Sequence, residues 1–207
     1  MRKWFGISCI FLGVLCILSA IGFIAHNRWE DQNAQYIAQD LLEDVQSIIH
    51  TPQPEQTLPD ETVSLPDDAE NIPAEMVTVE VGGYDCIGIL SVPVLNLELP
   101  VLTEWSYAKL KKAPCHYYGS YYEKDFVIAA HNYQSHFGRL SQLQTGDIII
   151  FTDAGGADHY YQVVLLETLP ATATEEMIAS GFDLSLYTCT PGGASRVTVR
   201  CSSITGA

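Results

Sequence analysis

Basic side chains are scarce in this sequence. Its 207 residues include ten Lys and Arg against 25 Asp and Glu, which gives a formal net charge of -15. A chain of that charge repels the phosphate backbone of nucleic acids, so we do not expect nucleic acid as a partner. Twelve of the acidic residues but only three of the basic ones lie in the first 75 positions, so over half of the net charge precedes the region expected to fold as the main domain.

Paired cysteines are also lacking. The six cysteines, at positions 9, 16, 86, 115, 189 and 201, show neither a CxxC pair nor the spacing of zinc ligands. Two of them lie in an apolar N-terminal stretch. A disulfide framework is therefore not indicated, although one bridge among Cys86, Cys115 and Cys201 stays open.

No metal-binding pattern is present either. His131 and His136 are five residues apart, a spacing that does not place both on one helical face. The acids between positions 153 and 176 form no compact loop of oxygen ligands of the kind that binds calcium. We expect no metal and no other cofactor.

What the chain does contain is one long apolar run, over residues 4–25, preceded by Arg2 and Lys3. At about 1.5 Å per helical residue, 22 residues span roughly 30 Å of hydrocarbon. A cleaved signal peptide is the alternative, but its apolar region is usually only about 7 to 15 residues long. We predict a cytoplasmic tip and transmembrane helix over residues 1–28, with the rest of the chain outside the cell membrane because the leading charges are basic.

Two further segments separate this anchor from the main domain. Apolar residues between Tyr36 and Ile49 recur at helical spacing, which predicts an amphipathic helix over residues 29–50, either a stalk or a helix packed on the domain. Residues 51–75 contain five prolines and seven acids and no basic residue, so we predict an acidic, Pro-rich linker there.

Residues 76–207 have the composition of a mostly β domain. Short apolar runs alternate with turn signals such as Gly-Gly pairs, which is typical of a barrel or a sandwich. A helical stretch is expected near residues 107–112. Strands are expected at residues 77–81, 86–92, 97–102, 126–130, 147–152, 160–168, 184–189 and 196–201.

Cys189 is the strongest candidate for a nucleophile. The apolar run before it ends at this cysteine, and Pro191 cannot continue a strand ladder, so the thiol is placed at a strand end. After a turn at Gly192-Gly193, an antiparallel hairpin would return Arg196 to Cys189, and a cation favours the reactive thiolate. A lone cysteine in a β domain is more often a small buried hydrophobe, and the other cysteines receive that interpretation.

His131 is the candidate proton carrier. It follows the apolar run of residues 126–130 and precedes a polar turn, a position where loops commonly carry function. An imidazole has the right unperturbed pKa to exchange a proton with a leaving amine. The aromatic pairs at residues 117–118 and 121–122 either line a peptide groove or are partly buried strand and turn residues.

These segments resemble the sortases, in the same order along the chain, over about residues 76 to 205. The Leu-x-Thr-Cys strand end followed closely by Arg is the most specific piece. Two features differ from the family: Ala130 stands where Gly often precedes the histidine, and the loop from Cys189 to Arg196 is short. The segments that carry the resemblance are Gly88 to Pro93, Leu99 to Val101, Val127 to Asn132, Leu186 to Cys189 and Arg196 to Arg200.

The resemblance implies an eight-stranded β-barrel and a cysteine transpeptidase on the surface of a Gram-positive bacterium. Cys189 would attack the peptide bond after Thr in an Leu-Pro-x-Thr type sorting signal, with His131 as acid and base and Arg196 as the oxyanion-stabilising or positioning cation. Asn132, Thr188 and Arg200 are expected to bind substrate.

The thioacyl group would then pass to an amine, either on a peptidoglycan precursor or on a pilin lysine. No lid segment is evident before the barrel. We therefore expect a class B- or D-like enzyme rather than a member of the lid-bearing pilin class. Two alternatives stay open: a membrane-tethered cysteine peptidase that transfers to water, and a non-catalytic surface-binding module.

Overall fold

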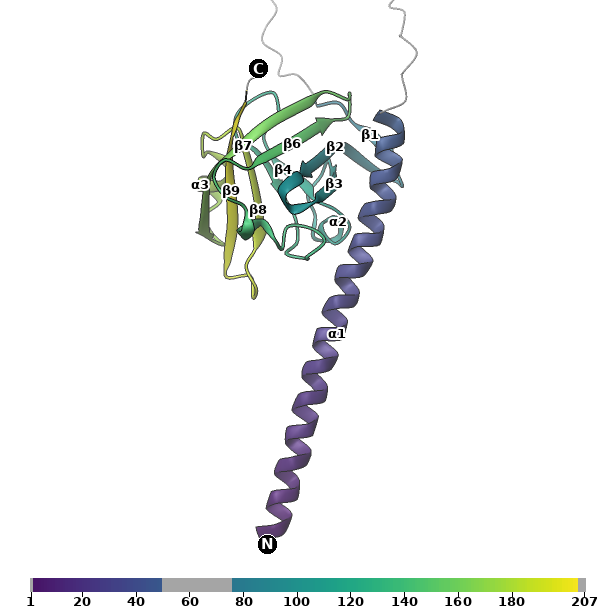
Figure 1. Ribbon diagram of the computed structural model, residues 1–207, viewed down its shortest axis with the longest axis vertical. Coiled ribbons are helices and arrows are strands. Elements are labelled where there is room, and N and C mark those ends of the chain that lie inside the picture. The colour runs from purple at the N-terminus through teal and green to yellow at the C-terminus, as the bar shows by residue number, and fades with distance from the viewer. Residues whose placement is uncertain (1, 50–75, 205–207) are drawn as a thin grey trace, which may run out of the picture.

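A long helix and a β domain make up the protein (Figure 1). The computed structural model describes residues 2–49 and 76–204. Helix α1 (Arg2–Ile49) is continuous, so the expected anchor and amphipathic segment form one rod of 48 residues, about 72 Å long at 1.5 Å per residue. The linker expected at residues 51–75 lies outside the described residues.

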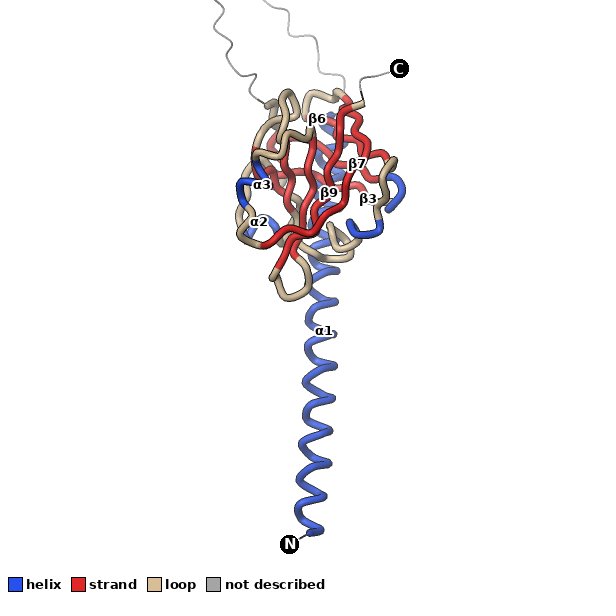
Figure 2. The backbone as a smooth tube through the Cα atoms, turned by 90° about the vertical axis from the view of Figure 1, so that its left-hand side faces the viewer, coloured by secondary structure: helices blue, strands red, loops and turns tan. Residues whose placement is uncertain are grey.

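The β domain is a single sheet that closes on itself (Figure 2). Nine strands follow one another in the order β1-β2-β3-β4-β5-β8-β9-β7-β6, and β2 also pairs with β6. That second pairing closes eight strands into a barrel, with β1 beside β2 outside the ring. The strands are β1 (Val79–Val81), β2 (Tyr84–Val92), β3 (Leu97–Leu102), β4 (Cys115–Tyr118), β5 (Phe126–Ala129), β6 (Ile148–Asp153), β7 (Asp158–Pro170), β8 (Leu184–Cys189) and β9 (Ser195–Ser203).

The expected eight-stranded barrel is thus confirmed, and eight of the nine strands coincide with predicted apolar runs. Strand β4 was missed because it has only four residues between Pro114 and Gly119, too few to show an alternating pattern. Two short helices lie outside the sheet, α2 (Tyr107–Leu110), where a helix was expected, and α3 (Thr174–Ile178) in the β7–β8 connection, where none was.

The barrel interior is a dense apolar core. Phe126, Ile128, Phe151, Leu184 and Leu186 are fully buried and belong to one continuous cluster. These residues come from β5, β6 and β8. The core therefore holds β5 and β8, the two strands whose ends lie at the candidate residues His131 and Cys189. Burying each such side chain contributes about 1.5 to 3 kcal/mol.

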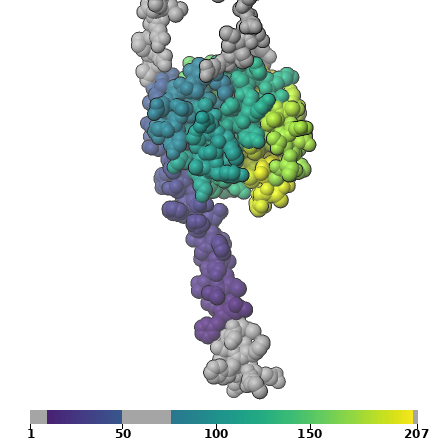
Figure 3. Space-filling view, turned by 180° about the vertical axis from the view of Figure 1, so that it is seen from behind, coloured from purple at the N-terminus to yellow at the C-terminus, as the bar shows by residue number. Residues whose placement is uncertain are grey.

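An apolar face on the last turns of α1 packs against the β domain. Ala34, Ala38, Leu41 and Val45 recur every three or four residues and are each at most 3% exposed. They face β1, β2 and β3, whereas Tyr36, at 72% exposed, points to solvent. Figure 3 shows this upper part of α1 lying against the barrel while its lower part stands free.

The free part of α1 is long and apolar enough to cross a membrane. Large apolar residues from Ile10 to Ile24 are exposed on every side of it. A helix that is apolar all round and touches no protein is suited to lipid. The β8–β9 hairpin lies at the end of the domain nearest this free part (Figure 1).

Closure of the barrel between β2 and β6 depends on Gly88. This residue has φ of 150° and pairs with Asp153. A β-carbon here would overlap the carbonyl oxygen of Thr152 and approach the Asp153 Cα to 2.9 Å.

We expect Gly88→Ala to lower the free energy of unfolding by about 2 kcal/mol or more, because the β2–β6 backbone must shift to admit the methyl group. Chemical denaturation of the purified protein measures this loss. Ser91→Ala in the same strand is the control and should change stability by less than about 0.5 kcal/mol. Equal stability of the two variants would show that closure tolerates a β-carbon at residue 88.

Candidate active site

Two strands far apart in the sequence end side by side at the candidate site. Strands β5 and β8 pair in parallel, with Ile128 opposite Leu186 and Ala129 opposite Tyr187. The next bond in the series runs from the Ala130 amide to the Tyr187 carbonyl, at 3.2 Å. Strand β5 ends at Ala129 and β8 at Cys189, so continuing this register by two positions predicts that His131 lies beside Cys189.

Thr188 fastens these two strand ends together. Its side chain points inward, is 3% exposed and donates a hydrogen bond of 2.8 Å from Oγ1 to the carbonyl of Ala130. That carbonyl belongs to the residue immediately before His131. The structure therefore places Thr188 as a support of the histidine backbone, although its surface also borders a cavity beside Cys189.

The β8–β9 hairpin brings a cation to the cysteine. Cys189 and Arg196 are cross-strand partners, so their side chains leave the sheet on the same face. Arg196 donates from Nη1 to the carbonyls of Gly193 and Ser195, at 3.0 and 3.1 Å. Gly192 and Gly193 have φ of 84° and 76°, and this left-handed backbone makes the short turn possible.

Cys189 differs from the other cysteines of the β domain in its exposure. It is half-buried, whereas Cys86, Cys115 and Cys201 are fully buried and their thiols are free. Burial raises the pKa of each of those three thiols to about 12, so they stay protonated at neutral pH. Within the described domain, Cys189 is the one thiol placed to react with a large substrate.

The environment of His131 favours its neutral form. Burial lowers the pKa of His131, the nearby Lys111 ammonium lowers it further, and the Glu30 carboxylate of α1 partly opposes both. Lys111 and Glu30 form an ion pair of 3.4 Å between Nζ and Oε1. Nε2 of His131 is buried and has no hydrogen-bond partner among the described residues.

The loop after His131 is compact and docks on α1. Oδ1 of Asp31 accepts hydrogen bonds from the amide and hydroxyl of Ser135, at 3.1 and 2.6 Å. His136 is completely buried, and burial lowers its pKa to about 4. A β-carbon at Gly138 would approach the carbonyl oxygen of Asn132 to 2.6 Å, so the turn requires glycine. Residues of α1 thus shape the loop that carries His131, which the sequence pattern did not indicate.

Cavities flank Cys189 on two sides. One of about 210 Å³ is bordered by Cys189 itself, Asn132 and residues 190–191. The other, of about 200 Å³, lies on the Arg196 side and is walled by Tyr187 and by residues 170–177 of the β7–β8 connection.

The second cavity is strongly aromatic. Trp105, Tyr107 and Tyr117 complete its wall, and the Tyr117 and Tyr187 rings meet edge to face with centroids 5.3 Å apart. Of the aromatic pairs singled out in the sequence, Tyr117 thus borders a groove beside the cysteine, while Tyr118 is exposed.

Arg200 does not join the group around Cys189. It is 1% exposed and bonds Glu167 at 2.8 Å and the Ser185 hydroxyl at 2.8 Å. It also donates to the carbonyls of Glu176 and Met177 around α3. Strand alternation puts it on the same outward face as Arg196, but the β7–β8 connection covers it there. Its hydrogen bonds hold that connection in place.

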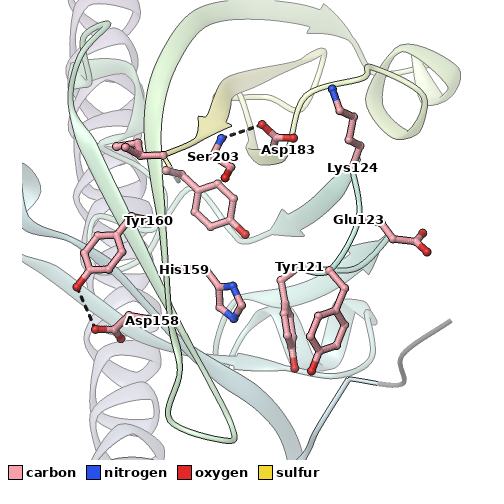
Figure 4. A pocket seen from close by; sticks show the side chains of 11 residues that line it. Tyr121, Glu123, Lys124, Asp158, His159, Tyr160, Asp183 and Ser203 are labelled. Carbon is pink, nitrogen blue, oxygen red and sulfur yellow. Dashed lines mark hydrogen bonds between the residues drawn. The ribbon is translucent and has the colours of Figure 1, made fainter. Parts of the chain in front are cut away.

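A larger cavity, of about 500 Å³, lies at the opposite end of the barrel (Figure 4). It is bordered by Lys124 and Asp183, which precede β5 and β8, whereas the candidate residues follow those strands. His159 faces it and bonds Asp153 at 2.9 Å. No cysteine borders this space, so its size alone does not make it the reactive site.

The arrangement at the other end fits nucleophilic acyl transfer. A half-buried thiol and a guanidinium lie on one face of the β8–β9 ladder, and an imidazole follows the neighbouring strand β5. These are the groups that such chemistry needs for attack, charge stabilisation and proton transfer. Asn132 and two cavities give the substrate space on either side.

Comparisons with known proteins agree with this geometry. Residues 90–204 match the profile of the Sortase domain family. No curated protein sequence matches the chain.

Solved structures share the fold. Sortase C from Clostridium perfringens SM101 is 23% identical, with a TM-score of 0.52, over 59% of this chain and 71% of that one. A Clostridium perfringens sortase D5 transpeptidase is 19% identical, with a TM-score of 0.52, over 58% and 80%. Sortase C1 from Streptococcus suis is 26% identical, with a TM-score of 0.51, over 59% and 74%. Because both C and D sortases match, the fold does not select a class.

The ion pair beside His131 gives a test of the site electrostatics. We expect Lys111→Met to raise the pKa of His131, because a neighbouring positive charge is removed, and Glu30→Gln to lower it. NMR titration of the His131 ring measures both shifts. Lys112→Met, whose ammonium lies 6.0 Å from the Tyr84 ring, is the control and should leave the titration unchanged. Shifts of the same sign in both variants would contradict the assignment.

Proposed function

The chain belongs to the sortase family, and from that premise we propose that it is a membrane-anchored cysteine transpeptidase in which Cys189, His131 and Arg196 carry the reaction. Its substrate would be a protein with an Leu-Pro-x-Thr type sorting signal. The observation that carries the proposal is the strand register. It pairs Cys189 with Arg196 in the β8–β9 ladder and, continued past the Ala129–Tyr187 pair of the β5–β8 ladder, supports a position for His131 beside Cys189.

In the first half of the reaction, the thiol proton of Cys189 passes to the His131 ring and the sulfur attacks the carbonyl carbon of the Thr in the signal. The C–N bond then breaks, the leaving amine takes that same proton from His131, and the acyl group stays on sulfur as a thioester. The unpartnered Nε2 of His131 supports this role, because no other described group competes for a proton at that nitrogen. In the second half, an acceptor amine attacks the thioester and the thiol is restored.

Arg196 is the cation closest in register to the sulfur. Its Nη1 is held by two hairpin carbonyls, which supports a role in stabilising the negative charge that develops on the carbonyl oxygen. A pre-positioned donor of this kind typically contributes 10²- to 10³-fold to the rate. Arg200, which is buried under α3, contributes only by holding the β7–β8 connection.

The aromatic cavity is suited to the apolar part of the sorting signal. Its rings, from Trp105, Tyr107 and Tyr117, stand next to Arg196, so a peptide with its scissile bond at Cys189 could extend a Leu-Pro pair into it. Leu169 and Pro170 of this chain pair with β9, and Pro170 forms part of the cavity wall. The Leu-Pro-Ala-Thr sequence at residues 169–172 is therefore a structural segment rather than a substrate.

The apolar part of α1 supports an anchor over residues 1–28 with its N-terminus in the cytoplasm. Arg2 and Lys3 stand before the apolar run, and the acids Glu30 and Asp31 follow it. The β domain would then lie outside the cell, on the surface of a Gram-positive bacterium. Such a setting places the enzyme where secreted proteins and cell-wall precursors meet.

We further propose that the protein is a class B- or D-like enzyme that anchors surface proteins, rather than one that polymerises pilins. Its support is the composition of residues 51–75, where five prolines and seven acids form no pattern typical of a lid. The acceptor would then be an amine of a peptidoglycan precursor, with a pilin lysine as the other candidate. Transfer to water alone would make the protein a tethered cysteine peptidase.

We expect Cys189→Ala to abolish both cleavage of Leu-Pro-x-Thr peptides and ligation to added amines, because no thioester can form. Arg196→Gln should lower kcat/KM by about 10²-fold. Lys124→Gln, at the far end of the barrel, is the charge-matched control and should leave the rate unchanged. Mass spectrometry of the products, with and without an amine, provides the measurement.

Cleavage that survives Cys189→Ala would overturn the proposed nucleophile. Product that is hydrolysed regardless of the amine supplied would instead favour the peptidase.

A further inference from the structure

A polar cavity of about 500 Å³ lies where α1 meets the barrel. Asn27 and Asp31 form its α1 wall, residues 132–134 of the loop after His131 form the second, and residues 191–192 of the β8–β9 hairpin form the third. It is thus built from the membrane-proximal helix and from both loops that carry the reactive residues.

This helix cavity adjoins the smaller cavity that Cys189 borders. Asn132, Gln134 and Pro191 line both spaces, so only these three residues lie between the α1 side and the space next to the sulfur. The aromatic cavity shares no lining residue with either of them. A thioester on Cys189 could therefore be approached from the α1 side while the peptide occupies the aromatic side.

The lining of the helix cavity favours a cation that donates hydrogen bonds. Asn27, Asn132 and Gln134 supply amide oxygens, Asp31 supplies the charge, and none of the described lining residues is basic. Ser135 bonds Oδ1 of Asp31 and so holds the carboxylate in place. A primary ammonium, with three donors and one positive charge, matches these acceptors.

The cavity also lies close to the membrane surface. Asn27 and Asp31 are two and six residues past Ala25, where the apolar run ends, which is about 3 to 9 Å along the helix. The headgroup region of a bilayer is about 5 to 7 Å thick on each side. A molecule held in the outer leaflet would therefore meet the cavity without leaving the membrane.

We propose that the helix cavity is the acceptor site of the proposed transpeptidation, and that Asp31 binds the primary ammonium of an acceptor carried on a membrane-bound molecule. This inference rests on the proposed function and adds where the second substrate enters. It also explains why the membrane-proximal helix contacts the loop of His131 rather than only the side of the barrel.

The transfer itself balances as follows. The bound ammonium loses one proton to water, its nitrogen lone pair forms the C–N bond, and the electron pair of the broken C–S bond returns to the Cys189 sulfur. A second proton passes from the nitrogen through the His131 ring to the sulfur. The third stays on the new amide, so the net products are the amide, the free thiol and one released proton.

Asp31→Asn tests the site without dismantling the loop, because the Asn oxygen still accepts from Ser135 while the charge is lost. The full-length chain is placed in phosphatidylcholine vesicles with a sorting-signal peptide and a short peptide carrying one free amine. The readout is the ratio of ligated to hydrolysed product as the amine concentration rises. We expect the amine concentration for half-maximal ligation to rise about tenfold or more, which corresponds to losing one charge-assisted bond.

Asp40→Asn is the matched control. It removes the same charge from an exposed position on the same helix and should leave the amine dependence unchanged. An Asp31→Asn enzyme with the wild-type amine dependence would overturn the inference. Loss of cleavage in the wild-type chain itself would instead overturn the proposed function, so the two failures are distinguishable.

A second experiment tests whether the acceptor amine is carried on a membrane-bound molecule. The same amine peptide is attached to a lipid in the vesicle or left free in solution at equal total concentration. We expect ligation of the lipid-bound form to be favoured at least tenfold by the full-length chain, because the cavity opens at the interface. Equal ligation of the two forms would contradict a membrane-carried acceptor.

Discussion

The parallel pairing of β5 with β8 is the constraint on which the rest of the site depends. It joins segments 58 residues apart through the Thr188 hydroxyl and the Ala130 carbonyl, and it is fixed from inside by Ile128 and Leu186 in the core. Because side chains alternate along a strand, burying those residues inward turns Cys189 outward. The short hairpin then brings Arg196 to the same face.

Helix α1 takes part in this site rather than only tethering it. Glu30 pairs with Lys111 beside His131, and Asp31 holds Ser135 in the following loop. The apolar residues that dock α1 on the barrel begin at Ala34, one turn beyond these polar contacts. The position of the candidate site relative to α1 therefore follows from ordinary helix packing.

Much of this could be predicted from the sequence, because apolar alternation marks each long strand and a Pro after Cys189 marks a strand end. The sequence pattern could not distinguish the role of Arg196 from that of Arg200, because strand alternation places both side chains on the same face. Only the packing of α3 against the sheet buries Arg200. Asp31 and Lys111 escaped notice for a related reason. Their roles arise from contacts across 104 and 81 residues, which no periodicity records.

The central claim is that Cys189 holds the substrate as a thioester. The most direct measurement is to mix the protein with a Leu-Pro-x-Thr peptide, quench with acid within the first turnover and locate any adduct by mass spectrometry of the digested chain. The account predicts an acyl mass on the peptide that contains Cys189, removed by hydroxylamine. An adduct on another residue, or release of product with no acyl-enzyme at any time, would contradict it.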